Sequence, residues 1–308
     1  MRICSLVPAA TEIVYALGAG HQVVAVSHEC DFPTSVKHKP KATRSVVDQE
    51  RFGSREIDEL VRAALRERQA LYELDETVLR EAAPDLIITQ ALCEVCAIDT
   101  STVVRTVRLL GLKPKILSLR SQTLSGLFEE IHVIGEAVGC APAAEQLVAS
   151  YRRRIGAVTE LTGSTQARPR VCCIEWFDPP MSCGHWVPEM VDLAGGYEVL
   201  GRVGERSHRL DGMQILSAQP EIVVLMPCGF SIERARRELP VLEAQSWWRR
   251  LTDSGAAQVF LVDGPAYFHR CGPRAIDGIE LLAALLFPER CGSFGIGSSA
   301  ERLSLAKA

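Results

Sequence analysis

The sequence has no run of apolar residues that approaches the roughly 18 needed to cross a membrane, so no membrane insertion is expected. It has no excess of basic residues, and the formal net charge is -4 at pH 7. The charge therefore gives no indication of binding to nucleic acid or to an anionic membrane. A nucleophile elbow, a P-loop and a dinucleotide-binding fingerprint are also missing. Ordinary hydrolase, kinase and dehydrogenase activities therefore lack support, and a binding protein is favoured over an enzyme.

The first twenty residues, MRICSLVPAATEIVYALGAG, lack the long apolar stretch and the small-residue cleavage site of a secretory signal. We therefore expect a cytoplasmic protein, although a chain whose signal had been removed would look the same and would be periplasmic. The chain has eleven cysteines, an odd number, in 308 residues. Without a secretory signal, reduced thiols are favoured over disulfides, some of them structural and some of them ligands.

Short β-branched segments alternate with helical patterns along the chain. This alternation is typical of α/β architecture with a mostly parallel sheet. The expected strands are 2–7, 22–27, 84–89, 115–119, 171–175, 221–226 and 259–263, and the expected helices include 10–17, 54–68 and 276–286.

Two similar lobes account for this pattern. A long helical region extends from Thr123 to about Leu161, interrupted near residues 140–145, and the polar segment LTGSTQARPR after it indicates a boundary. The segments LREAAPDLIITQ and LSAQPEIVVLMP place a helix, a proline, an acid and an aliphatic strand at matching offsets. The sequence thus predicts two Rossmann-like α/β lobes joined by a long helix. The N-terminal lobe spans residues 1–121, the connecting helix 122–165 and the C-terminal lobe 166–308.

Reactive and aromatic side chains concentrate directly after the expected strands, where ligands bind in α/β sheets. In the first lobe these residues are His28, Glu29, Cys30, Asp31, Gln90, Cys93 and Cys96; in the second they are Glu175, Trp176, Cys183, His185, Trp186, Cys228, Tyr267, Phe268, His269, Arg270 and Cys271. Cys172 and Cys173 lie within an expected strand and are interpreted as core residues.

The segment QALCEVCA places the C-x-x-C pair Cys93 and Cys96 directly after a buried strand. A single C-x-x-C without a second one at zinc-ribbon spacing is a moderate indication of a metal site, and simple core packing is the alternative. If the neighbouring strand end contributes Cys30 or His28, the group would suit zinc, iron or an iron–sulfur cluster. We favour the metal site over packing.

In this order, the motifs resemble the helical-backbone (class III) family of periplasmic substrate-binding proteins, and within it the vitamin B12-binding branch. The opening LVPAATEIVYALGAG is similar to the family's S-P-x-x-T-E with a trailing glycine, and VVAVSHECDFP to its V-G-V-S segment followed by D-Y-P. IEWFDPPMSCGHWVPEMVDLAGG resembles the second-lobe strand and helix, and FHRCGPRAIDGIELLAALLFP the closing F-x-R-x-x-P-R and terminal helix. The similarity covers nearly the whole chain.

The resemblance implies a ligand cleft between the lobes that holds cobalamin, another corrinoid or a related metal chelate. Aromatic side chains would supply flat walls for an apolar corrin, and the neutral imidazole of His28 or His185 would be a ligand for cobalt or iron. We predict that the ligand is contacted by Pro8, Thr11, His28, Glu29, Gln90, Trp176, Phe177, His185, Tyr267, Phe268 and Arg270.

The chain departs from the family at several positions. Gln90, Met181 and Ser207 stand where B12-binding members carry cage aromatics, and Ala266 replaces a cleft aspartate. The glutamates with which members dock on a membrane permease fall on Thr77 and Met213, so docking on a standard import permease is not expected. Residues 53–72 look like an extra helix in the first lobe, compared with the family. For the oligomeric state, we expect a monomer or a weak dimer.

Three functions are compatible with these residues. The first is a soluble binding protein for a corrinoid or related metal chelate, used for handling and not for import. The second is a cytoplasmic metalloprotein or redox enzyme whose Cys/His site in the interlobe cleft holds zinc, iron or an iron–sulfur cluster. The third is an import component for a different chelate. Metal analysis and an absorption spectrum separate the first two.

Overall fold

The structure, a computed structural model, describes residues 1–91, 98, 100–163, 168–295 and 297–303. They form two compact units: unit 1 comprises Met1–Arg51 and Glu59–Ser150, and unit 2 comprises Phe52–Asp58 and Tyr151–Ala308. The chain therefore passes from one unit to the other three times. No helix in the described ranges is both long enough and apolar enough to cross a membrane.

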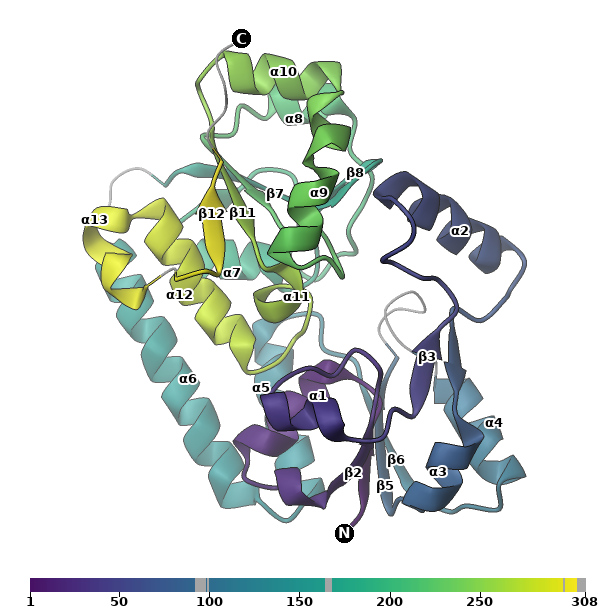
Figure 1. Cartoon of the computed structure of the whole chain (residues 1–308). Coiled ribbons are helices and arrows are strands. Elements are labelled where there is room, and N and C mark those ends of the chain that lie inside the picture. The colour runs from purple at the N-terminus through teal and green to yellow at the C-terminus, as the bar shows by residue number, and fades with distance from the viewer. Residues whose placement is uncertain (92–97, 99, 164–167, 296, 304–308) are drawn as a thin grey trace. The chain divides into compact units, whose positions relative to one another are not determined.

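Unit 1 is built on a parallel sheet with the strand order β2-β1-β5-β6 (Figure 1). Its strands are β1 (Ile3–Ser5), β2 (Val23–Val26), β5 (Leu86–Gln90) and β6 (Lys115–Leu119). Every neighbouring pair is parallel. All four strands therefore end at the same edge of the sheet, which brings the segments that follow them together.

Helices of unit 1 pack on this sheet through apolar side chains. They are α1 (Pro8–Ala16), α3 (Glu76–Ala82), α4 (Thr100–Leu109) and α5 (Leu124–Ala137). Cys4 and Ile87 of the sheet form one buried cluster with Leu79 of α3 and Val103 of α4. The helix α1 begins with Pro8 at its first position and is followed by Gly18, whose φ of +79° favours glycine.

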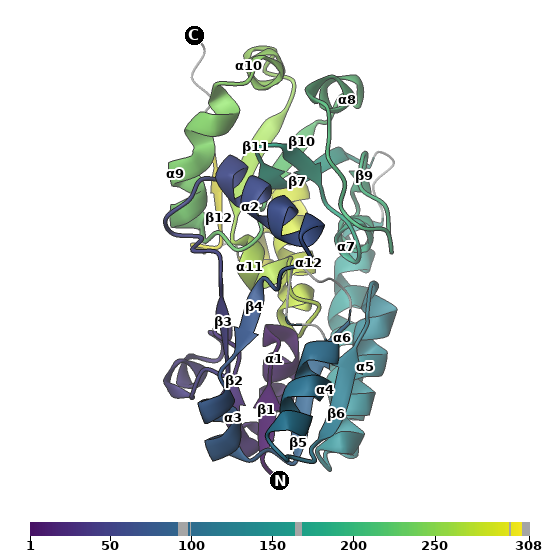
Figure 2. The ribbon, with the colours of Figure 1, turned by 90° about the vertical axis from the view of Figure 1, so that its right-hand side faces the viewer.

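A small antiparallel pair also belongs to unit 1. Strands β3 (Thr43–Ser45) and β4 (Tyr72–Leu74) lie side by side (Figure 2), and the chain between them contains α2 (Ser54–Arg66). The sequence places this helix in the first lobe. In the structure, the residues up to Asp58 belong to unit 2.

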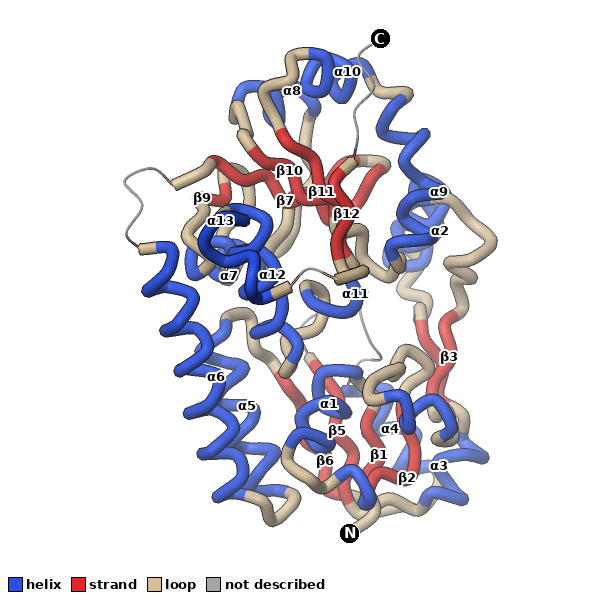
Figure 3. The backbone as a smooth tube through the Cα atoms, turned by 60° about the vertical axis from the view of Figure 1, so that its left-hand side comes forward, coloured by secondary structure: helices blue, strands red, loops and turns tan. Residues whose placement is uncertain are grey.

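The predicted long helical region is present as two helices. The helical structure is interrupted at residues 138–140, after α5, and α6 (Ala141–Thr162) follows with 22 residues (Figure 3). Gly139 in the break has a φ of +76°. The boundary between the two units falls between Ser150 and Tyr151, inside α6.

Unit 2 contains a mixed sheet with the order β12-β11-β10-β7-β8, and β9 pairs with β7 (Figure 3). Its strands are β7 (Arg170–Phe177), β8 (Pro180–Ser182), β9 (Tyr197–Glu198), β10 (Ile222–Leu225), β11 (Gln258–Val262) and β12 (Ala300–Arg302). The central strands β7, β10 and β11 are parallel, whereas β8 and β12 are antiparallel to their neighbours.

The helices of unit 2 pack on this sheet and on each other. They are α7 (Val187–Leu193), α8 (Gly212–Ser217), α9 (Ile232–Glu243), α10 (Ser246–Asp253), α11 (Gly264–Tyr267), α12 (Arg274–Leu286) and α13 (Pro288–Cys291). Helix α12 contacts α7 and α11, and α9 contacts β7 and β11. Two α/β units on parallel strands, with one long helix running through both, confirm the predicted fold class.

Candidate functional site

His28 is the second residue after β2, at the carboxyl edge of the sheet in unit 1. Its Nδ1 lies 2.8 Å from Thr43 Oγ1, and its backbone N–H donates to the same oxygen at 3.1 Å. The ring centroid lies 5.7 Å from that of Tyr72. Thr43 holds the imidazole through Nδ1, and the Tyr72 ring lies beside the imidazole ring. Nε2 is therefore the nitrogen that remains for a ligand.

The electrostatic environment keeps His28 uncharged. Burial lowers the pKa of His28 below its usual value, and the positive charge of Lys41 lowers it further. Nε2 lies 4.0 Å from Glu29 Oε1, which is longer than a hydrogen bond. A neutral, oriented imidazole is the form that binds cobalt or iron.

Three other predicted residues lie at the same edge. Pro8 begins α1, while Thr11 and Cys30 are buried behind it. The Thr11 hydroxyl donates to Ser5 Oγ at 2.8 Å and lies 3.1 Å from Cys30 Sγ. The structure thus brings Pro8, Thr11, His28, Glu29 and Cys30 together, with Thr11 and Cys30 as supports beneath the surface.

A small hollow marks this edge. It is lined by Leu6, Pro8, Ser27, His28, Glu29, Thr43, Tyr72 and Ile98. Its volume is about 10 Å³, which is room for about one water molecule. Pockets for small-molecule ligands measure roughly 300–1,000 Å³, so this hollow alone does not enclose such a ligand.

Gln90, the last residue of β5, is half-buried and pairs with Leu119 of β6 at the same edge. Cys93 and Cys96, which follow it in the sequence, lie outside the described residues. The metal site predicted for this cysteine pair, with Cys30 or His28 as a further ligand, therefore stays a prediction.

In unit 2, Trp176 and Phe177 at the end of β7 are covered by the chain itself. Trp176 is 9% exposed, and its indole N–H donates to the Ser54 carbonyl at 3.1 Å. Its ring packs 5.2 Å from that of Phe230, and the Arg234 guanidinium lies 4.5 Å above the centre of Phe230. Phe177 is fully buried.

The segment Phe52–Asp58 is held on unit 2 by charged groups. Ser54 donates to Glu238 Oε2 from its backbone N–H and its hydroxyl, at 3.1 and 3.0 Å. Arg234 pairs with Glu238 at 3.0 Å and donates to the Phe52 carbonyl at 2.8 Å. Two further ion pairs, Arg55 with Asp178 at 2.8 Å and Asp58 with Arg209 at 2.6 Å, extend this attachment.

The remaining predicted residues of unit 2 lie near Trp186. His185 has a φ of +53°, unusual for a residue with a side chain, and its ring stacks on Trp186 at 5.7 Å. Among the described residues its buried Nδ1 has no hydrogen-bond partner. The Trp186 indole donates to the Phe268 carbonyl at 2.7 Å, which ties the His185 segment to the end of α11.

The residues around α11 differ in accessibility. Tyr267 and Arg270 are half-buried, and the Tyr267 hydroxyl lies 2.9 Å from Ser299 Oγ. Phe268 is fully buried. Burial lowers the pKa of His185, and Arg206 lowers it further, so this imidazole is also neutral. Of the predicted aromatic walls, Tyr267 is thus the one that is partly open.

Sequence reasoning missed several residues that position the site. Thr43 and Tyr72, which orient His28, come from short strands in a region with no clear periodicity. Phe230, which packs against Trp176, and Arg234, which lies over Phe230, come from a loop and a helix without a recognisable motif. Trp186, in contrast, was already among the residues expected after the strands of the second lobe.

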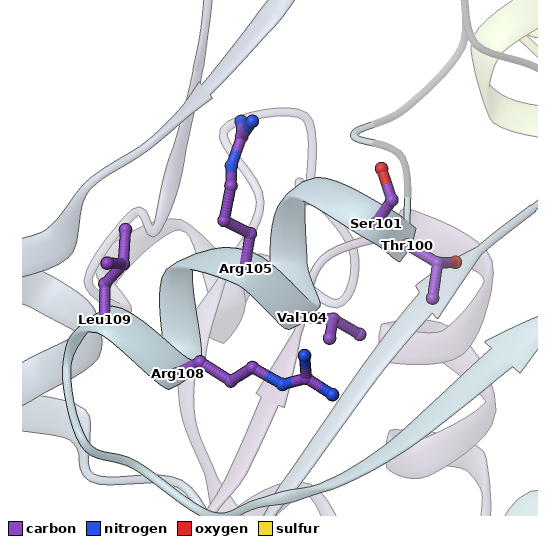
Figure 4. A pocket seen from close by; sticks show the side chains of 6 residues that line it. All are labelled: Thr100, Ser101, Val104, Arg105, Arg108 and Leu109. Atoms are coloured by element: carbon purple, nitrogen blue, oxygen red, sulfur yellow. The ribbon is translucent and has the colours of Figure 1, made fainter.

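A broader hollow, of about 740 Å³, lies against α4 (Figure 4). Among the described residues, its lining consists of Thr100, Ser101, Val104, Arg105, Arg108 and Leu109, all from this one helix. None of the residues predicted to bind a ligand is among them. A hollow lined by one helix face does not converge on a ligand from several sides, so the His28 edge remains the candidate site in unit 1.

Comparisons with known proteins agree with this architecture. The sequence profile of the periplasmic binding protein family matches residues 3–252. An uncharacterised ABC transporter substrate-binding lipoprotein, YvrC, of Bacillus subtilis is 23% identical over 290 residues, which are 94% of this chain and 80% of that protein. A vitamin B12-binding protein of Vibrio cholerae is 25% identical over 288 residues, which are 92% of this chain and 88% of that protein.

Solved structures show the same fold. A periplasmic heme-binding protein of Pseudomonas aeruginosa matches with a TM-score of 0.68 and 19% identity, covering 98% of this chain and 95% of that one. The vitamin B12-binding protein BtuF of Vibrio cholerae matches with a TM-score of 0.62 and 20% identity, covering 92% and 96%. Relatives of the B12-binding and the heme-binding branches thus match alike. Because the family profile spans most of its length, the chain belongs to the periplasmic binding protein family.

Proposed function

We propose that this chain is a substrate-binding protein of the ABC-transporter type whose ligand is a metal chelate of tetrapyrrole size, with a corrinoid as the first candidate. The observation that carries the proposal is His28: a neutral imidazole, fixed by Thr43 and Tyr72, at the carboxyl edge of a parallel sheet. In such sheets this edge is where ligands bind.

The chemistry of the edge fits a metal chelate better than a sugar or an amino acid. Pro8, Tyr72 and Ile98 offer apolar surface beside the His28 ring. A flat macrocycle needs such surface, and its metal needs one axial ligand, which Nε2 of His28 would supply. Tyr267 and Arg270 of unit 2, both half-buried, stay ligand contacts predicted from the sequence.

The named relatives support the ligand class and bear on location. They include proteins described as binding vitamin B12 and heme. The solved heme-binding and B12-binding proteins are described as periplasmic, and YvrC is described as a lipoprotein. The cytoplasmic location and the absence of docking on a standard permease stay predictions from the sequence. Thr77 and Met213, which stand at the docking positions, are both exposed.

Calorimetric titration tests the ligand class. The full chain is titrated separately with cobinamide, cobalamin and heme. We expect saturable 1:1 binding of at least one corrinoid, because the axial position and the apolar surface act together. Saturable binding of heme alone would move the assignment to the heme-binding branch. No heat with any of the three would contradict the proposal and favour the metalloprotein alternative.

A further inference from the structure

Unit 2 contains a buried group of two thiols and a carboxylate that the ligand site does not use. It consists of Cys173 in β7, Cys183 directly after β8, and Glu198 in β9, all of them on adjacent strands. One ligand atom from each lies within 4.8 Å of the other two. Both cysteines are fully buried and Glu198 is 9% exposed.

Glu198 is held by backbone amides and not by a cation. Its Oε1 accepts from the N–H groups of Leu200 and Gly201, both at 2.9 Å, and its Oε2 accepts from the N–H of Cys173 at 3.0 Å. Across the described ranges no lysine, arginine or histidine forms an ion pair with it. The Cys173 thiol also forms a hydrogen bond with the Glu198 carboxylate, so the carboxylate is in direct contact with the thiol pair.

The backbone fixes the two thiols beside the Glu198 carboxylate. The Cys183 N–H donates to the Cys173 carbonyl at 3.1 Å, and the two side chains are hydrogen-bonded to each other. Gly201 closes the group: a Cβ at this position would lie 2.6 Å from Cys183 Sγ and 2.7 Å from the Cys183 carbonyl oxygen. Only glycine therefore lets this turn approach the thiol.

We propose that Cys173, Cys183 and Glu198 supply three of the four ligands of a site for one divalent cation of the zinc class. Two sulfurs and one oxygen are ligands that zinc accepts, at bond lengths of about 2.3 and 2.0–2.2 Å. Ligand atoms on one tetrahedral ion lie about 3.5–4 Å apart at those bond lengths, so small side-chain rotations close the present spread. On binding, the two thiols release their protons to solvent and the cation takes their place between the sulfurs and Oε2.

Such an ion would join three strands of unit 2 at one point. It would link β7 to the end of β8 and to β9, and Cys183 lies two residues before His185. The cation would therefore restrain the segment that carries His185. This inference does not depend on the proposed ligand, because it concerns a separate group of side chains inside one unit.

Cobalt(II) replaces zinc and reports thiolate ligation by its absorption. The test uses the full chain with Cys93 and Cys96 both changed to Ser, kept reduced and stripped with a chelator, so that the predicted C-x-x-C site does not contribute. Cobalt is supplied both to the native protein and during refolding, because the group is buried. We expect one equivalent of cobalt with thiolate-to-cobalt absorption, displaced by zinc, and a higher melting temperature with zinc.

Matched cysteine variants locate the site. In the same background, Cys173→Ser and Cys183→Ser should each abolish the thiolate-to-cobalt band and the zinc-dependent rise in melting temperature. Cys172→Ala, a change in an equally buried neighbour outside the group, should keep both. The proposal is overturned if folded protein binds no cobalt by either route, if the Cys173 and Cys183 variants keep the band, or if the two thiols are found joined in a disulfide that resists reduction.

Discussion

At the scale of single residues, burial sets the charge of three histidines. It lowers the pKa of His28, His185 and His269, because a partly dry environment disfavours the imidazolium form. For His28 this keeps the ring available to a metal. His269 instead has a structural role, since its Nε2–H donates to the Met226 carbonyl.

The protonation of His269 should make the protein sensitive to mild acid. Its pKa is lowered to about 4, whereas an unfolded histidine titrates near 6.5. Between these values the unfolded chain binds more protons than the folded chain, so the free energy of unfolding should fall as the pH is lowered from about 6.5 to about 4. Above pH 6.5 this residue should add no pH dependence.

Urea unfolding of the wild type and of His269→Gln across this range checks the effect. Glutamine keeps an N–H donor for the Met226 carbonyl but does not titrate. The variant should lose less stability than the wild type between pH 6.5 and pH 4. Equal losses in the two proteins would show that His269 is not the responsible group.

At the scale of elements, the sequence patterns predicted the parallel strands well. The segment 115–119 coincides with β6, and 84–89 overlaps β5. These strands are short apolar runs bounded by turn residues, and local patterns are sufficient to identify them. Strands β3, β4 and β8 were missed, because these three-residue strands are defined by pairing with other segments and not by periodicity.

The candidate site could be predicted only in part for the same reason. Pro8, Thr11, His28 and Cys30 were predicted to converge because parallel strands share a carboxyl edge. The partners that fix them, Thr43 and Tyr72, come from the unpredicted β3–β4 pair. Likewise, no local pattern indicates that Ser54 covers Trp176, because that contact joins residues 122 positions apart.

The first turn of α2 should detach from unit 2 when Glu238 is removed. Glu238 and Arg234 are each 9% exposed in their side chains, and breaking a buried pair by removing one partner costs about 3–5 kcal/mol. In Glu238→Ala, the Ser54 N–H loses its acceptor. Its hydrogen exchange should accelerate, together with a loss of stability of that order.

Glu233→Ala is the matched control, because Glu233 is an exposed acid on the same helix. A surface change of this kind should alter stability by no more than about 0.5 kcal/mol. It should leave the exchange of Ser54 unchanged. If both variants leave the Ser54 amide equally protected, Glu238 does not hold this segment.

At the scale of the whole molecule, the order of motifs was more informative than any single one. Segments at 6–20, 23–33, 174–196 and 268–288 together indicated a two-lobed binding protein, and the family profile over residues 3–252 agrees. The ligand could not be predicted as firmly. Relatives described as binding vitamin B12 and heme share the fold at about 20% identity with this chain, so the fold alone does not specify the ligand.

The central claim is that His28 binds the metal of a chelate, and visible absorption of a corrinoid titrated into the chain tests it most directly. Cobinamide should show a saturable band shift with the wild type and with His21→Ala, a change at the opposite end of β2. The shift should disappear in His28→Ala while that variant keeps its fold. The same band shift in His28→Ala as in the wild type would contradict the account.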